Sequence, residues 1–191
     1  MNYLNIYPTS IVDGLGIRTS IYLSGCDMNN GKSIDGHCFG CHNPESHSFC
    51  NGKLYTEETE NKLIEYLSKS YCSGLCISGG EPMSIKLQKE VSEILKRIRP
   101  HLKKNQDIWL FSGFEWEDFL DNGKRNTKYT QDILINIDVA VLGPFIIEKR
   151  DITANNPFRG STNQYIIDVK ETLRQNKIIL LEGIKNNSLN N

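Results

Sequence analysis

The chain has 191 residues, enough for one compact domain with its own hydrophobic core but too few for two cores of useful size. Its 22 basic and 23 acidic residues nearly cancel, so no global field attracts nucleic acid or an anionic membrane surface, and we predict neither as a partner. The start, MNYLNIYPTSIVDG, lacks a basic region followed by an apolar run, and no window holds the roughly 18 apolar residues that a membrane helix needs, which predicts a cytoplasmic protein.

The first predicted strand is IRTSIYL (17–23), in which apolar and polar residues alternate. A loop rich in glycine and asparagine follows, from Ser24 to about residue 54. Thr56 is a good cap for a helix with apolar residues at helical spacing up to Tyr71. The next predicted strand, GLCIS (74–78), leads directly into a glycine pair.

The second half of the chain continues the alternation of strands and helices. An amphipathic helix is predicted from Ser84 to the breaker Pro100, with cations in its last turn. The later elements are predicted as a strand over 107–113, short helices over 115–120 and 131–135, strands at VAVLG (139–143) and YIIDV (165–169), a helical turn at KETLRQN (170–176) and a last strand at KIILL (177–181). We predict a single domain over residues 1–185 and a polar, frayed tail over 186–191.

Strands that alternate with helices predict an α/β fold with a mostly parallel sheet and outer helices. About six strands are predicted, and a complete eight-fold barrel needs around 250 residues, so we expect an open or partial (β/α) barrel. Ligands bind such sheets at the carboxyl ends of the strands. Cys26 and the pair Gly79-Gly80 each follow a predicted strand, so we expect them to face one pocket.

The cysteines pose a question of chemistry, because three of them, Cys26, Cys38 and Cys41, lie in a stretch that cannot form a core. Without an export signal, metal ligation is favoured over disulfides for this group. A closed zinc site would take a fourth ligand from His37, His42 or Cys50, all of which lie in or next to this stretch. A cluster of four irons held by three thiolates would instead leave one iron open for a small molecule.

The remaining cysteines receive other interpretations. Cys72 and Cys76 flank and enter a predicted buried strand, where a cysteine packs as a small hydrophobic residue. Cys50 is not predicted as a ligand, because a fourth protein ligand would block the open iron.

Several motifs, in their order along the chain, carry a resemblance. The three cysteines, GCHNPE (40–45) and SGGEP (78–82) resemble the cluster loop and glycine motif of radical S-adenosylmethionine enzymes. Within that class, the chain resembles the activating proteins of anaerobic ribonucleoside-triphosphate reductase over nearly all of residues 1–170. The motifs that carry this second resemblance are YPTSIVDGLGIRTSIYLSGC (7–26), DIWLFSGFEWEDF (107–119), VAVLGPF (139–145) and FRGSTNQ (158–164).

The resemblance implies a [4Fe-4S] cluster held by Cys26, Cys38 and Cys41, whose open iron is chelated by the amino and carboxylate groups of S-adenosylmethionine. It further implies that the bound cofactor is contacted by Gly40, Cys41, His42, Gly79, Gly80 and Glu81. Glycine suits such a contact, because it lets the backbone approach a ligand closely.

The same resemblance implies that an external donor such as reduced flavodoxin supplies an electron and that S-adenosylmethionine is cleaved to methionine and a 5′-deoxyadenosyl radical. This radical then removes a hydrogen atom from a glycine of the reductase large subunit.

Other hypotheses about the function stay open at this point. VDGLGIR and CHNP also resemble the activator of pyruvate formate-lyase, and a lengthened first cysteine spacing occurs in some enzymes like 7-carboxy-7-deazaguanine synthase. A zinc-binding structural module without catalysis is the alternative from another class.

Two further features bear on function. Members of the resembled class usually have three residues between the first and second cysteine, whereas this chain has eleven, DMNNGKSIDGH, with Ile34 where a cysteine is expected. We interpret this as an eight-residue insertion, which costs roughly 1 kcal/mol in loop closure.

The polar segment 148–164 is predicted to border the pocket and to help receive the partner's glycine loop through Arg159, with a plain solvated loop as the alternative.

Overall fold

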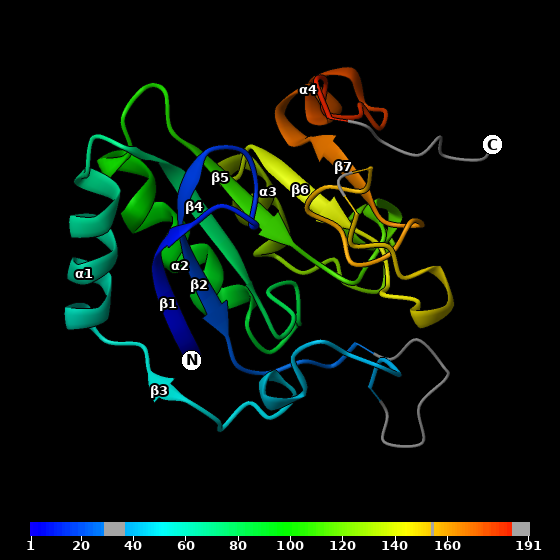
Figure 1. Ribbon diagram of the computed structural model, residues 1–191, viewed down its shortest axis with the longest axis horizontal. Helices are drawn as coiled ribbons and strands as arrows, with labels where there is room; N and C mark the ends of the chain where they lie inside the picture. The colour runs from blue at the N-terminus through cyan, green and yellow to red at the C-terminus, as the bar shows by residue number, and fades with distance from the viewer. Residues whose placement is uncertain (29–36, 154, 185–191) are drawn as a thin grey trace.

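The computed structural model describes residues 1–28, 37–153 and 155–184, and Figure 1 shows how its elements are arranged. In these ranges one seven-stranded sheet runs in the order β3-β1-β2-β4-β5-β6-β7. The strands are β1 (Asn2–Ser10), β2 (Ile17–Leu23), β3 (Lys53–Leu54), β4 (Cys72–Gly79), β5 (Asp107–Phe111), β6 (Val139–Leu142) and β7 (Tyr165–Asp168). The α-helices are α1 (Glu57–Ser68), α2 (Gln88–Ile98), α3 (Thr130–Asn136) and α4 (Val169–Gln175).

The sheet is parallel only in its middle. β2, β4, β5 and β6 pair in parallel, whereas β1 and β3 on one side and β7 on the other pair antiparallel. The α/β class is therefore confirmed, and the sheet is mixed rather than mostly parallel throughout. Closure into a partial barrel stays a prediction.

The strand β1 was not predicted, and its sequence explains why. It lies near one edge of the sheet, contains Pro8, and places partly exposed residues on both of its faces. Proline and a weak apolar alternation are typical of edge strands, which single-sequence patterns identify poorly. β1 pairs with β2 as an antiparallel hairpin whose loop comprises residues 11–16.

The helices follow the predicted amphipathic patterns, with corrections at their ends. Thr56 caps α1 in a capping box with Thr59, as its sequence indicates. α1 ends at Ser68, so the prediction that Tyr71 belongs to its apolar stripe is wrong, and this side chain is 47% exposed. α2 begins at Gln88 rather than Ser84, and the short helix predicted near residue 115 is a 3-10 turn, Trp116–Phe119.

The C-terminal elements agree in part with their predictions. β7 and α4 form where the sequence indicates them. The predicted strand KIILL is not a regular strand: it follows the edge of β7 through one isolated bridge, Ile167 to Leu180, and two backbone hydrogen bonds. The predicted tail over 186–191 lies outside the described residues, and the single-domain organisation stays a prediction.

The two faces of the sheet are covered differently. Apolar residues of α1, α2 and α3 pack with strand residues such as Ile21 and Ile77 into the main core. The other face carries a smaller cluster around Trp109, which is covered by loop residues including Phe158. This second face therefore has room for a ligand, because no helix of the main core packs on it. Across the described ranges, no helix is long and apolar enough to cross a membrane.

Candidate functional site

The carboxyl ends of β2 and β4 meet, as the sequence predicts. Leu23 and Gly79 are register partners in the parallel pair. Beyond them, the Gly80 N–H donates to the Leu23 carbonyl at 2.9 Å and the Glu81 N–H donates to the Gly25 carbonyl at 2.8 Å. The loop that begins with Cys26 and the glycine motif are thus joined directly through their backbones.

Close packing of these two backbones requires glycine at both positions of the pair. Gly79 has a φ of +106°, and a Cβ there would lie 2.3 Å from the Leu23 nitrogen. A Cβ on Gly80 would lie 2.2 Å from the Gly25 carbonyl oxygen. No real Cβ tolerates such distances, so the pair has a structural reason that is independent of any ligand. Both glycines also line the cavity described next.

One cavity of about 680 Å³ is lined by all three clustered cysteines and by the glycine motif. The cysteine loop is fixed against the end of β2, where Gly25 and Cys26 donate backbone hydrogen bonds to the carbonyls of Ser46 and His47 at 2.8 and 3.1 Å. A turn joins the other two cysteines, because the Cys41 N–H donates to the Cys38 carbonyl at 3.1 Å. The structure therefore brings Cys26, Cys38 and Cys41 to one space.

The surroundings of the thiols fit an iron–sulfur cluster. The N–H groups of Met28 and Asn43 point at the sulfurs of Cys26 and Cys41, both at 3.4 Å, and such bonds stabilise the negative sulfur of a cluster ligand. Burial, together with the charges of Glu81 and the other two cysteines, raises the pKa of Cys26 to about 12 against the lowering effect of the Met28 N–H. A thiolate at this position therefore needs a bound cation, which the irons of a cluster supply.

A site for a single metal ion would need its ligands closer together than a cluster does. Within residues 1–28, 37–153 and 155–184, no three His, Cys, Asp or Glu side chains lie in an arrangement that holds a metal ion. The ligands of a cluster are spread more widely than those of one ion, because each thiolate binds its own iron.

Glu81 is a buried carboxylate that ties the end of β4 to the end of β5. It is 1% exposed and accepts hydrogen bonds from the Met83 N–H, the Ser112 hydroxyl and the Gly113 N–H at 2.7 to 2.9 Å. Burial raises its pKa to about 7, which outweighs the opposite effect of the three donors. Its carboxylate holds the cavity wall in shape, and a contact with a cofactor stays a prediction.

We expect the shifted pKa of Glu81 to appear in the pH dependence of folding stability. The unfolded chain releases this proton near pH 4.5 and the folded protein near pH 7, so the free energy of unfolding falls as the pH rises between these values and is then constant. The size of this fall is roughly 3 kcal/mol. Urea denaturation of the wild type and of Glu81→Gln across pH 4–8 measures it, and parallel curves for the two proteins would contradict the assignment.

His42, Asp13 and Tyr22 line both this cavity and a second cavity, which lies over β1 and β2. The His42 ring packs edge-on against Phe145, with 4.7 Å between ring centroids. Asp13 is buried and accepts hydrogen bonds from the hydroxyls of Ser10 at 2.6 Å and Tyr22 at 2.7 Å. Burial and the bond to Asp13 raise the pKa of Tyr22, so its hydroxyl keeps its proton. Sequence reasoning predicted His42 but missed Ser10, Asp13 and Tyr22, although Asp13 stands in the motif VDGLGIR.

The opposite wall comes from described residues of 152–153 and 156–164. Asn156, Arg159 and Ser161 are buried, so the alternative of a plain solvated loop is wrong for this part of the segment. Arg159 lines the cavity and its guanidinium donates to the Gln164 carbonyl at 3.3 Å. Phe158 has a left-handed φ of 61° and its ring packs edge-on against Trp109. A bulky residue in this conformation marks a wall held in a strained shape.

The other cysteines lie as the sequence suggests. Cys72 and Cys76 are buried in the packed strand, which confirms their role as small hydrophobic residues. Cys50 is exposed and is absent from the residues that line the described cavity. His37 and His47 stack with 3.8 Å between ring centroids. Most of the proposed insertion, residues 29–36, lies outside the described residues.

Known proteins of similar sequence identify the family of this chain. The family model of the 4Fe-4S single cluster domain matches residues 12–167. Anaerobic ribonucleoside-triphosphate reductase-activating protein of Vibrio cholerae is 34% identical over 168 residues, which cover 87% of this chain and 97% of that protein. The chain belongs to this activating-protein family.

Other members of the activating-protein family show similar matches. The protein of the same name from Enterobacteria phage T4 is 30% identical over 86% of this chain and 92% of its own length, and that of Escherichia coli K12 is 28% identical over 87% and 97%. Membership of the activating-protein family confirms the resemblance found in the motifs. The matched 4Fe-4S domain also includes the three cysteines and the glycine motif, which favours a cluster over the zinc alternative.

Proposed function

We propose that the chain generates the glycyl radical on anaerobic ribonucleoside-triphosphate reductase, acting as a radical S-adenosylmethionine enzyme. The observation that carries this proposal is the convergence of Cys26, Cys38, Cys41 and the motif SGGEP on one cavity. The relatives are named as activators of that reductase, and no feature of the site favours pyruvate formate-lyase or a deazaguanine precursor instead.

The chain's own residues have distinct tasks in this proposal. The three cysteines hold a [4Fe-4S] cluster, and His42, Gly79, Gly80 and Glu81 border the space for S-adenosylmethionine. Gly40, for which the resemblance also implies a cofactor contact, is not among the described residues that line the cavity. A cluster held by these cysteines would supply the electron for reductive cleavage of S-adenosylmethionine, the chemistry that would remove a hydrogen atom from a glycine of the reductase. The N–H groups of Met28 and Asn43 tune the sulfurs, and Glu81 fixes the wall.

The fold supports the remaining parts of the proposal. We assign residues 1–185 to one radical S-adenosylmethionine domain, an open or partial (β/α) barrel whose uncovered sheet face receives the glycine-bearing loop of the reductase large subunit. A reduced flavodoxin or similar protein in the cytoplasm is the proposed electron donor. These assignments draw on the resemblance of the motifs and on the placement of the cavity on the face without main-core helices.

Cleavage of S-adenosylmethionine tests the proposal. The chain, reconstituted with iron and sulfide without air and then reduced with dithionite, is expected to yield methionine and 5′-deoxyadenosine in equal amounts, measured by chromatography. Omitting the reductant or replacing Cys41 by alanine is expected to stop the reaction. A colourless zinc protein, or a fully loaded brown protein that leaves S-adenosylmethionine intact, would overturn the radical mechanism.

A further inference from the structure

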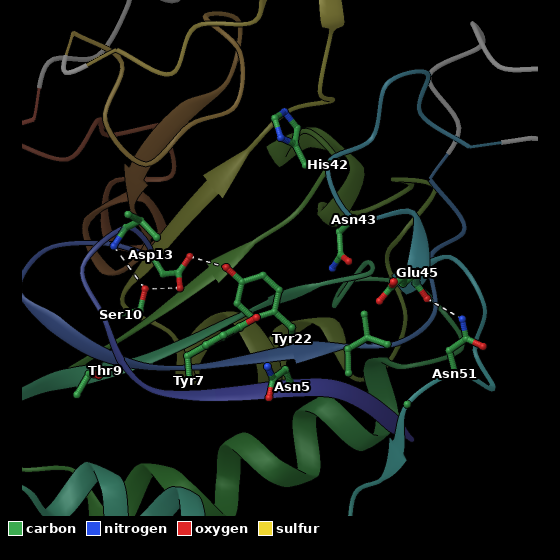
Figure 2. Close-up of a pocket in the computed structure, with 13 residues that line it drawn as sticks. Asn5, Tyr7, Thr9, Ser10, Asp13, Tyr22, His42, Asn43, Glu45 and Asn51 are labelled. Atoms are coloured by element: carbon green, nitrogen blue, oxygen red, sulfur yellow. Dashed lines mark hydrogen bonds between the residues drawn. The ribbon is translucent and has the colours of Figure 1, made fainter.

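A second cavity of about 910 Å³ lies over β1 and β2, on the sheet face that carries the cysteine cavity and no helix of the main core. Its floor is made by residues of these two strands, and its far wall by the loop that follows the third cysteine. Figure 2 shows Tyr7 and Tyr22 at its centre, Asp13 on one side, and Asn43 and Glu45 on the other.

The two cavities are continuous in their lining. Five residues line both of them: Val12, Asp13, Tyr22, His42 and Asn43. A ligand that lies in the second cavity therefore reaches the cysteine cavity by passing these shared residues. The second cavity offers a route to the cysteine cavity from the β1 side.

The chemistry of the second cavity excludes some ligands. Asp13 and Glu45 line it, and among the described residues that do so there is no lysine or arginine. Nucleotides and other phosphates are disfavoured in such a groove, because their charges would meet carboxylates. Amide and hydroxyl groups of Asn5, Thr9 and Asn51 are spaced along its length instead. Such groups suit the N–H and carbonyl groups of an extended polypeptide.

Tyr7 gives this groove an anchor. It is 47% exposed, and its ring stands edge-on to Tyr22 with 5.4 Å between centroids. Tyr22 in turn donates its hydroxyl to Asp13. Tyrosine is over-represented at binding hot spots, because it offers a large rigid surface at a low entropy cost. An exposed tyrosine supported from below by a fixed second ring is arranged for such a contact.

We infer that this groove, which we call the β1 groove and define by Asn5, Tyr7, Thr9, Tyr22, Asn43 and Glu45, binds the extended glycine-bearing segment of the partner reductase and guides it into the cysteine cavity. The inference rests on the proposed function and adds the path of the segment and its anchor, Tyr7. The segment enters over β1 and passes Asp13 and His42.

Peptide binding to single-residue variants tests this inference. The probe is a fluorescent synthetic peptide with the sequence of the reductase glycine loop, titrated by anisotropy against the cluster-loaded chain with S-adenosylmethionine, without air. Tyr7→Ala is expected to weaken binding roughly tenfold, and Tyr7→Phe, which keeps the ring, to bind nearly as the wild type. Tyr71→Ala is the matched control, because Tyr71 is also 47% exposed but lies outside the groove.

The outcomes separate the inference from the proposed function. Iron content equal to wild type shows that the Tyr7→Ala protein is folded. Equal peptide affinity of Tyr7→Ala and wild type, or equal losses in Tyr7→Ala and Tyr71→Ala, would overturn the β1 groove and leave the proposed function standing. A wild-type chain that cleaves S-adenosylmethionine but never binds the peptide would contradict both the groove and the proposed partner.

Discussion

Replacing Cys26 by alanine is expected to remove the iron–sulfur cluster. Cys26 follows β2 directly, lines the cavity with the other two thiols, and receives the Met28 N–H at its sulfur. With only two thiolates left, two irons of a cubane would lack a protein ligand, so the cluster would not be retained. After anaerobic reconstitution, we expect about four irons per chain in the wild type and close to none in Cys26→Ala.

The control for this experiment is Cys50→Ala. Cys50 belongs to the same loop but is exposed and is not among the residues that line the described cavity. We expect its iron and sulfide content, and its brown absorption band, to equal those of the wild type. Loss of the cluster in Cys50→Ala together with its retention in Cys26→Ala would show that the ligand set is assigned wrongly.

Gly79→Ala is expected to lower the free energy of unfolding by roughly 3–5 kcal/mol. Two effects add here. The residue has a φ of +106°, which an alanine adopts only with strain, and the new Cβ would lie 2.3 Å from the Leu23 backbone nitrogen. Because both partners are backbone, relief requires β2 and β4 to separate at the end where the site is built. Urea denaturation at constant pH measures the loss.

Gly183→Ala is the matched comparison for this prediction. Gly183 also has a left-handed φ, +75°, but a Cβ there would meet nothing within 4 Å. Its replacement should therefore cost only the backbone strain, about 1 kcal/mol. Equal losses in the two variants would show that the close approach of β2 and β4 does not decide the stability of this corner.

The sequence predicted correctly those strands whose own residue pattern is distinctive. Alternation identified β2, and the run GLCIS identified β4, because buried parallel strands are continuous and apolar. From these two strands, the meeting of Cys26 with Gly79 follows by the rule that parallel strands end at one edge of the sheet. The site was thus located before its geometry was known.

Contacts between segments that lie far apart along the chain could not be predicted from the sequence. Two of the three donors to Glu81, Ser112 and Gly113, lie about thirty residues away in the loop that follows β5, and no local pattern indicates them. The hydrogen bond from Tyr22 to Asp13 likewise depends on how the hairpin loop folds over the sheet. β1 was missed because a strand near the sheet edge with a proline and polar residues lacks the buried alternation on which prediction depends.

Electron paramagnetic resonance of the partner reductase tests the central claim most directly. The reconstituted, reduced chain is mixed without air with S-adenosylmethionine and the anaerobic ribonucleoside-triphosphate reductase of the same organism. The account predicts a glycyl radical doublet that depends on the chain, on S-adenosylmethionine and on reductant, and that is absent with Cys26→Ala. Absence of the doublet from a wild-type chain with a full cluster, under conditions in which another activating protein produces it on its own reductase, would contradict the account.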